Sequence, residues 1–146
     1  MRRFEIAKGY DLSLKLPQRS TLKSAGYDFA ICEDLIVEPF SIAYAKTGIK
    51  VKMLDDEILQ IFPRSSLPSN YGLTIPNNVG IIDADYYNNS DNDGAIFIQL
   101  YNFTKEATHL KSGTRIAQGI FTRYLTVDDD CPKQHDRQGG FGSTGA

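Results

Sequence analysis

The sequence is dominated by short runs of apolar, β-branched and aromatic residues, separated by turn residues about every ten positions. Pro, Gly and paired Asp residues mark the breaks, and no window of a dozen residues carries a helical period. This pattern predicts an all-β fold, either a sandwich, a jelly roll or a barrel. The expected strands are 34–37, 41–51 with a break near Lys46, 57–62, 73–75, 79–82, 95–102, 107–110 and 115–127.

Residues 1–16 are expected to form an opening strand of mixed polarity. Leu12, Leu14 and Leu16 alternate with Ser13 and Lys15, which predicts one buried side and one solvent-facing side. The 146 residues suit one domain, and no repeat or linker divides them. We therefore expect a single domain over 1–146, with a β core at 1–133 and a mobile, glycine-rich lid at 134–146.

Charge and composition exclude several classes of function. The formal net charge is −2 and no long basic stripe occurs, which argues against nucleic acid as the main partner. No window approaches the roughly 18 apolar residues of a membrane span, and no apolar signal region follows the N-terminus. The two cysteines, Cys32 and Cys131, are more typical of a reducing compartment than of a disulfide framework, so the expected location is the cytoplasm.

The stretch 80–86 places two carboxylates and an aromatic ring on a short apolar run that begins at a glycine. If it is extended, Asp83 and Asp85 share one face, and Ile82 and Tyr86 lie on the other. An acidic pair beside a ring suits a site for a flat, polar substrate. The same residue types also make an ordinary hairpin tip, and the stretch by itself favours that simpler interpretation.

Three further polar groups stand beside apolar strands. Asp28 is interpreted either as a functional carboxylate or as a solvent-facing strand residue. Arg64, Ser65 and Ser66 follow a predicted strand, where a guanidinium and two hydroxyls suit an anion, although a serine cap on a short turn is the simpler explanation. Gln118 is predicted to be buried and must then be hydrogen-bonded, either within the sheet or to a ligand.

The polar segment 88–94 is expected to be a solvated hairpin loop. Its acid and amide oxygens would suit calcium, but the EF-hand spacing and its closing glutamate are absent. His109 has no Cys or His at ligand spacing, so we expect a surface strand residue rather than a metal ligand.

The C-terminal stretch 137–145 combines several glycines with an arginine, two hydroxyl residues and Phe141. Glycine backbone can wrap phosphate oxygens through its N–H groups, and a segment this rich in glycine is expected to be mobile when empty. It is not a nucleotide P-loop, because no lysine follows. A disordered tail is the alternative, although such tails are usually poor in aromatic residues.

Taken together and in this order, five stretches resemble the five motifs of the trimeric dUTP pyrophosphatases (dUTPases), especially those of Gram-positive bacteria and their phages. The stretches are 24–28, 63–67, 80–86, 115–118 and 137–145. A single motif would be a weak signal, whereas five in order across most of the chain are a strong one. The glycine-rich tail is the most specific of them.

The resemblance implies an all-β, jelly-roll-like fold of the β-clip or distorted-barrel type. It implies a homotrimer with active sites at the subunit interfaces, and hydrolysis of dUTP to dUMP and pyrophosphate. That reaction limits the incorporation of uracil into DNA and supplies dUMP for dTMP synthesis. Mg²⁺ would be the cofactor and would ride on the triphosphate, with Asp28 contacting it at most through water.

Position by position, the resemblance also implies a role for each motif. Asp83 would orient and deprotonate the water that attacks the α-phosphorus, and Tyr86 would pack beneath the deoxyribose. The hairpin backbone at Gly80 and Ile82, together with Asn77, would read the uracil edge. The residues that would hold the phosphates or close over the substrate are Arg64, Ser65, Ser66, Gln118, Arg137, Phe141, Gly142, Ser143 and Thr144.

The chain departs from the family pattern in the second and third motifs. Ser66 stands where glycine is usual, Pro68 stands where alanine is common, and the loop 87–94 replaces an Arg-Gly pair after Tyr86. These departures bear on how closely the second motif approaches phosphate.

Two rival functions use the same features. A dCTP deaminase, alone or as a bifunctional enzyme, would need a catalytic glutamate in the third motif, and that stretch contains none. A non-catalytic nucleotide-binding or regulatory protein is disfavoured by the joint presence of Asp83, Tyr86, Arg137 and Phe141. The sequence leaves open whether an active enzyme would also bind a regulatory or inhibitor protein.

Overall fold

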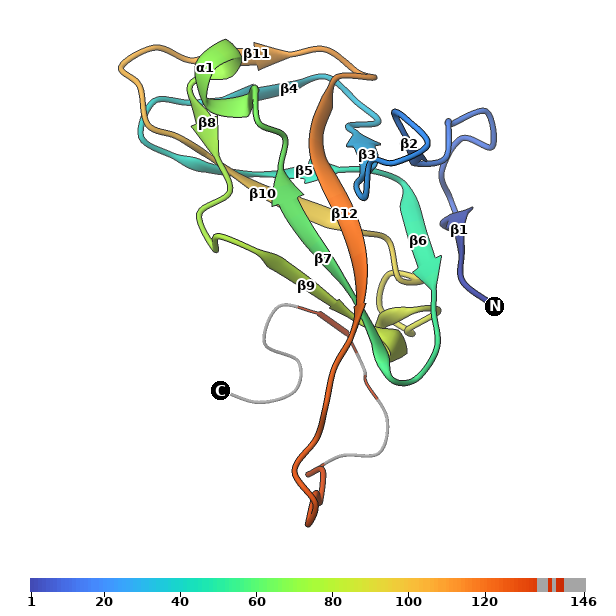
Figure 1. The fold of residues 1–146 in the computed structure, drawn as a ribbon. Helices are drawn as coiled ribbons and strands as arrows, with labels where there is room; N and C mark the ends of the chain where they lie inside the picture. The colour runs from blue at the N-terminus through green and yellow to red at the C-terminus, as the bar shows by residue number, and fades with distance from the viewer. Residues whose placement is uncertain (134–136, 138, 141–146) are drawn as a thin grey trace.

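The computed structural model describes residues 1–133, 137, 139 and 140. The all-β architecture expected from the sequence is confirmed, with only two short helical turns in this part of the chain (Figure 1). The strands are β1 (Arg3–Ile6), β2 (Gln18–Arg19), β3 (Tyr27–Ala30), β4 (Leu35–Val37), β5 (Ile42–Lys46), β6 (Ile49–Lys52), β7 (Glu57–Pro63), β8 (Leu73–Thr74), β9 (Gly80–Asp83), β10 (Phe97–Asn102), β11 (Thr108–Leu110) and β12 (Arg115–Arg123). The helical turns are α1 (Leu67–Tyr71) and the 3₁₀ turn η1 (Ala84–Tyr86).

The largest sheet carries most of the motif residues. Its strand order is β2-β3-β12-β7-β9, and each neighbouring pair is antiparallel. Smaller sheets are formed by β5-β10-β8, by β1-β6 and by β11-β4. In Figure 1, β7 and β12 run side by side through the middle of the molecule, with β9 next to β7.

A contiguous hydrophobic cluster joins the sheets. Fully buried side chains come from β3, β7 and β10, for example Phe29, Leu59 and Leu100. The sheets of β4 and β6 add Val37 and Val51. Along β7 the buried and less buried residues alternate, as a strand with one face on a core requires.

The expected opening strand over 1–16 is wrong beyond its first part. Pairing with β6 ends at Ile6, and Leu12 is 85% exposed. The physical reason is local turn chemistry, because the Asp11 carboxylate accepts a hydrogen bond from the Ser13 amide at 2.8 Å. The amide of Leu14 also turns back to the Asp11 carbonyl, at 3.1 Å.

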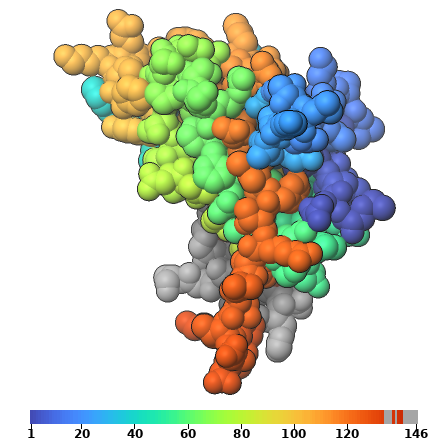
Figure 2. Space-filling view, in the orientation of Figure 1, coloured from blue at the N-terminus to red at the C-terminus, as the bar shows by residue number. Residues whose placement is uncertain are grey.

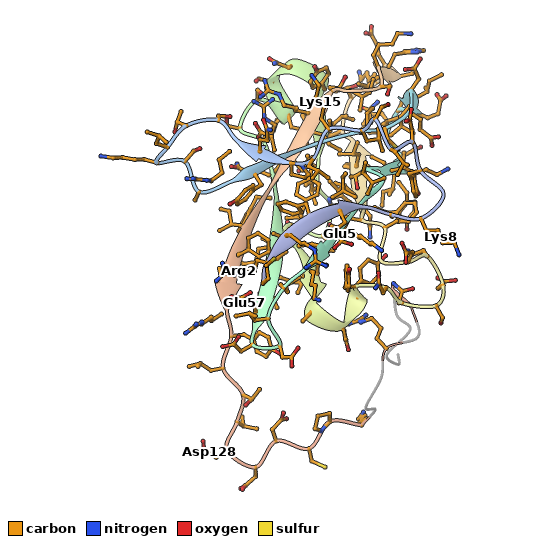
Figure 3. The ribbon with its side chains drawn as sticks, turned by 90° about the vertical axis from the view of Figure 1, so that its right-hand side faces the viewer. Arg2, Glu5, Lys8, Lys15, Glu57 and Asp128 are labelled. Atoms are coloured by element: carbon orange, nitrogen blue, oxygen red, sulfur yellow. The ribbon has the colours of Figure 1, made fainter. Side chains whose placement is uncertain are left out.

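The last strand is shorter than the expected 115–127. Its pairing ends with Arg123 opposite Glu57, where β7 begins, so the chain beyond has no partner strand there. The following residues leave the body of the molecule as an extended arm, on which Asp128 lies (Figures 1, 2 and 3). Leu125 on this arm is 97% exposed.

The helix α1 is a single turn between the second motif and β8. Pro68 lies in its first turn, and Gly72 ends it in the left-handed conformation, with φ of 63°. No helix in the described part of the chain is long and apolar enough to cross a membrane.

Candidate active site

The third motif forms the edge strand β9 and the turn that follows it. Gly80 pairs with Ile61 of β7, and Asp83 pairs with Ile58. A Cβ atom on Gly80 would lie 3.2 Å from the Ile61 Cβ, so this register leaves little room for a side chain at Gly80. The backbone of β9 is therefore held flat against β7.

The extended segment ends at Asp83, and residues 84–86 turn as η1. The expectation that Asp83 and Asp85 share a strand face is therefore wrong. Arg137 nevertheless brings the two carboxylates together. Its Nη2 atom donates to Asp83, and its Nε atom donates to Asp85 at 2.7 Å.

Tyr86 is buried under the loop that follows it, with 6% of its surface exposed. Its hydroxyl donates to the Ala95 carbonyl at 2.9 Å and accepts from the Asn92 amide at 2.7 Å. Burial raises the pKa of this hydroxyl above its ordinary value. A Cβ atom on Gly140 would lie 2.9 Å from the Tyr86 ring, so glycine at this position allows the tail to approach the ring.

These residues line a cavity of about 250 Å³. Its floor is apolar, with Ile61, Ile75 and Phe97 among the lining side chains. The sequence-predicted site residues that meet in it are Asn77, Gly80, Ile82, Asp83, Tyr86 and Arg137. A partly apolar cavity with a carboxylate, an amide and a guanidinium at its wall is suited to a ring-bearing, anionic small molecule.

A second group of predicted residues gathers around Asp28 in β3. The Asp28 carboxylate forms ion pairs with Arg64 at 3.3 Å and with Arg115 at 3.1 Å. It also accepts a hydrogen bond from the Ser20 hydroxyl at 3.1 Å. Asp28 is therefore neither a plain solvent-facing residue nor an unpaired carboxylate.

Gln118 lies opposite Asp28 in the sheet, and its amide donates to the Pro63 carbonyl at 3.3 Å. A Cβ atom on Gly26 would lie only 2.3 Å from the Gln118 Oε1 atom. The glycine of the first motif is therefore required by the glutamine of the fourth. Ser66 precedes α1, but its side chain makes no capping hydrogen bond, so the simple cap explanation is wrong.

The two groups lie at opposite ends of β7. Asp83 pairs with Ile58 near its beginning, and Arg64 follows its last residue, Pro63. The six intervening steps correspond to about 20 Å, because a strand rises about 3.3 Å per residue. Arg64, Ser65, Ser66 and Gln118 do not line the cavity that holds Asp83.

The remaining expectations concern the tail residues, His109 and the two cysteines. Phe141, Gly142, Ser143 and Thr144 lie outside the described residues. His109 is exposed on β11, as expected. Cys32 is partly buried, Cys131 is exposed, and neither forms a disulfide. Among the described residues no group of three or more His, Cys, Asp or Glu side chains is placed to hold a metal ion.

The segment 88–94 is only in part the solvated loop that its composition predicts, since Asn88, Ser90 and Asp91 are exposed. Asn89 and Gly94 are buried, and the Asn89 side chain bonds to the Tyr86 carbonyl at 2.8 Å. The sequence reasoning also missed Phe97 and Gln99, which line the cavity from β10. For the compact loop, the available signal in the sequence was the run of asparagines, because their side chains can replace backbone partners in a turn.

Comparison with known proteins identifies relatives along the whole chain. The family model of the dUTPases matches residues 12–145. The deoxyuridine 5'-triphosphate nucleotidohydrolase of Lactococcus lactis is 43% identical over 148 aligned positions, covering 100% of this chain and 99% of the relative. The enzyme of the same name from Wolinella succinogenes is 33% identical and covers 89% and 86% of the two chains.

Solved structures agree with the fold. The dUTPase of Streptococcus mutans superposes with a TM-score of 0.83 at 41% identity, over 86% of this chain and 98% of that one. A point mutant of the dUTPase from phage phi11 of S. aureus, described as coordinating a structural Mg(II) ion, gives 0.73 at 19% identity over 92% and 97%. The more distant structure supports the fold alone, and the expected fold class is confirmed.

Proposed function

The chain belongs to the dUTPase family, whose members are dUTP diphosphatases, and we propose that it hydrolyses dUTP to dUMP and pyrophosphate. The observation that carries the proposal is the cavity in which Asp83, Tyr86 and the backbone of β9 meet. In the cell this reaction would limit the incorporation of uracil into DNA and supply dUMP. We place the protein in the cytoplasm, where its unpaired cysteines remain reduced.

The base and the sugar fit the apolar part of the cavity. The backbone of Gly80 and Ile82, with the Asn77 amide, offers hydrogen-bonding groups to the uracil edge. The Tyr86 ring packs beneath the deoxyribose, where an added 2′-hydroxyl would meet the ring. A wrong base leaves buried polar groups unpaired, which is a strong basis for rejection.

Asp83 holds the attacking water in line with the α-phosphorus and accepts its proton. A carboxylate is a weak base at neutral pH, so most of the rate gain comes from the position of the water and from neutralised phosphate charge. The Arg137 guanidinium already meets Asp83 and Asp85. Because guanidinium binds phosphate with the same donors, we propose that Arg137 moves to the triphosphate and releases Asp83 to the water.

The phosphate-binding residues come from another copy of the chain. Arg64 lies about 20 Å along β7 from the position of Asp83, farther than a triphosphate extends. A site that uses both residues therefore requires two subunits, which supports a homotrimer with shared sites. Ser65, Ser66 and Gln118 accompany Arg64, and we propose that residues 134–146 close over the substrate as a lid.

The described residues do not fit a resident metal cage. Within residues 1–133, 137, 139 and 140 no acidic or histidine cluster is placed for one, and Asp28 is neutralised by Arg64 and Arg115. We therefore assign Mg²⁺ to the substrate, as the Mg–dUTP complex, which needs few protein ligands. In this arrangement Asp28 orients the two arginines instead of binding the metal.

An assay of pyrophosphate release in the presence of Mg²⁺ tests the proposal. The substrates compared are dUTP, dCTP, dTTP and UTP. Turnover of dUTP alone is expected. Release of ammonia from dCTP would instead identify a deaminase, and tight binding of dUTP without turnover would identify a regulatory nucleotide-binding protein.

A further inference from the structure

A buried lysine lies next to the site but outside its cavity. Lys50 is on β6, and 11% of its side chain is exposed. Its ammonium group donates to the Asn88 Oδ1 atom at 2.6 Å and to the Asp93 Oδ2 atom at 2.8 Å. A buried ammonium group is costly unless it is paired in this way, so its position is closely determined.

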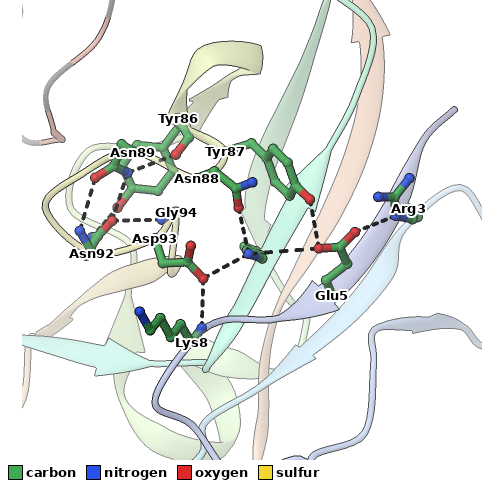
Figure 4. A network of polar contacts seen from close by, with 11 residues as sticks. Arg3, Glu5, Lys8, Tyr86, Tyr87, Asn88, Asn89, Asn92, Asp93 and Gly94 are labelled. Carbon is green, nitrogen blue, oxygen red and sulfur yellow. Dashed lines mark hydrogen bonds and ion pairs between the residues drawn. The ribbon is translucent and has the colours of Figure 1, made fainter.

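The lysine joins the loop 87–94 to the first strand. Its Nζ atom lies 3.9 Å from Glu5 of β1 and 5.0 Å from the centre of the Tyr87 ring. The Tyr87 hydroxyl donates to the same Glu5 carboxylate at 2.8 Å. Figure 4 shows Glu5, Asn88 and Asp93 converging between β1 and the loop.

The two loop residues that the lysine holds have unfavourable backbone conformations. Asn88 and Asp93 have φ of 58° and 61°, in the left-handed region. Asn and Asp enter this region more readily than other residues with a Cβ atom, but it remains less favourable than the right-handed region, so surrounding contacts help to hold it. The Asn88 amide also donates to the Asp93 carbonyl at 3.2 Å, so the lysine bridges the two ends of one closed turn.

The loop in turn holds Tyr86. Asn92 donates to the Tyr86 hydroxyl at 2.7 Å, and Asn89 donates to the Tyr86 carbonyl at 2.8 Å. A Cβ atom on Gly94 would lie 2.8 Å from that carbonyl, so the loop is packed against the tyrosine backbone. A change in the loop would therefore move the ring.

We propose that Lys50 is a positioning residue for sugar selectivity, which fixes the loop 87–94 and through it the ring of Tyr86. The inference rests on the proposed function, in which Tyr86 measures the deoxyribose. The lysine itself does not line the cavity. The ammonium of Lys50 and the amide of Lys8 hold the pKa of Asp93 below its ordinary value, so this carboxylate stays charged at neutral pH.

The first test is the ratio of kcat/KM for dUTP to kcat/KM for UTP in Lys50→Met. We expect the ratio to fall by about tenfold, since a small displacement of a positioning group has effects of this size or larger. Amide hydrogen exchange in residues 87–95 should become faster. Arg2→Met is the matched control, because it removes another ion pair of a buried partner, Glu57, without touching the loop. Its ratio should stay unchanged.

A second pair of variants keeps the inference testable if Lys50→Met fails to fold. Asp93→Asn should lower the ratio, because it removes the charge that faces the ammonium group. Asn88→Asp combined with Asp93→Asn moves the charge to the other lysine partner and should restore the ratio. A purely structural effect on the fold would not produce this rescue.

The outcomes separate this inference from the proposed function. If the wild type hydrolyses dUTP and rejects UTP, but Lys50→Met keeps the ratio within about twofold, the inference is wrong and the function stands. If Asn88→Asp fails to rescue Asp93→Asn, the role of the ammonium group is also contradicted. If the wild type does not hydrolyse dUTP, the proposed function fails and the inference falls with it.

Discussion

Asp83 and Asp85 are like residues at one turn, but their surroundings differ. Both accept hydrogen bonds from Arg137, but only Asp83 lines the cavity with Tyr86 and β9. Asp85 is exposed and does not line that cavity. We therefore assign the water to Asp83.

Asp83→Asn is expected to lower kcat by roughly 10²–10⁴-fold, the usual contribution of a general base. The affinity for a non-hydrolysable dUTP analogue should change little, because the amide keeps the shape of the side chain. The measurements are kcat and equilibrium binding. Asp85→Asn is the matched control and should keep most of the activity. A kcat near that of the wild type in Asp83→Asn would remove Asp83 from its role.

At the scale of elements, the central sheet transmits constraints between motifs. The first and fourth motifs meet where β3 pairs with β12, and Gly26 leaves the space that the Gln118 side chain occupies. Two motifs that lie far apart in the sequence thus share one steric contact in the sheet.

Gly26→Ala should displace Gln118 and so raise the KM for dUTP more than it lowers kcat. Overpacking at a buried site also costs about 1–3 kcal/mol of unfolding free energy. Steady-state kinetics and urea unfolding measure the two effects. Ala25→Ser, at the exposed neighbouring position, should leave both unchanged. An unaltered KM in Gly26→Ala would show that Gln118 does not contact the substrate.

The contact between the N-terminal segment and β7 predicts a dependence of stability on pH. Glu57 is buried, which by itself raises its pKa, but hydrogen bonds from Arg2 and from the Leu54 amide lower it overall. A carboxylate whose pKa is lowered by folding stabilises the protein above its ordinary pKa, and this stability is lost as the pH falls through the folded value.

Arg2→Met should therefore lower the melting temperature by a few degrees at pH 7, and the difference from the wild type should vanish in acid. Thermal unfolding between pH 7 and pH 3 measures this. Lys111→Met removes a fully exposed ion pair with Asp34 and should have no effect at either pH. A difference that persists unchanged in acid would mean that Arg2 acts through packing alone.

At the scale of the whole molecule, the predicted site residues of one chain fall into two separate groups. The cavity with Asp83 and the cluster around Asp28 and Arg64 lie at opposite ends of β7. We propose that the active unit is an assembly in which these two groups meet from different copies of the chain.

Mixed assemblies test this arrangement. Asp83→Asn and Arg64→Ala should each be inactive alone, but mixing them during refolding should restore activity. Random 1:1 assembly of trimers would return about a quarter of the sites, because three quarters of the trimers are mixed and each of these has one intact site in three.

The matched control is a mixture of two single variants, Asp83→Asn and Tyr86→Ala, refolded together. These residues line the same cavity of one chain, so mixing the two variants creates no intact site, and the activity should not exceed that of the Tyr86→Ala subunits alone. If the first mixture also stays inactive, although differently tagged subunits co-purify, the two-chain site is contradicted.

Local patterns in the sequence were sufficient for the β architecture and for naming six residues that line the cavity. Apolar alternation and turn residues act over a few positions, so the strands from β4 to β12 could be located closely. The functional role of the tail stays a prediction, which was made because nothing in an ordinary surface segment requires that combination of residues. The same reasoning failed at Leu12, where one Asp11 side chain replaced strand pairing by a turn.

Only the tertiary structure decided which distant polar groups neutralise one another. Lys50 lies on β6, and its anionic partners come from β1 and from the loop 87–94, which are distant in the sequence. Arg137 meets Asp83 across 54 positions, and Asp28 meets Arg115 across 87. The physical reason is that residue types and short-range sterics select secondary structure, whereas burial makes a charge costly until the fold brings its partner.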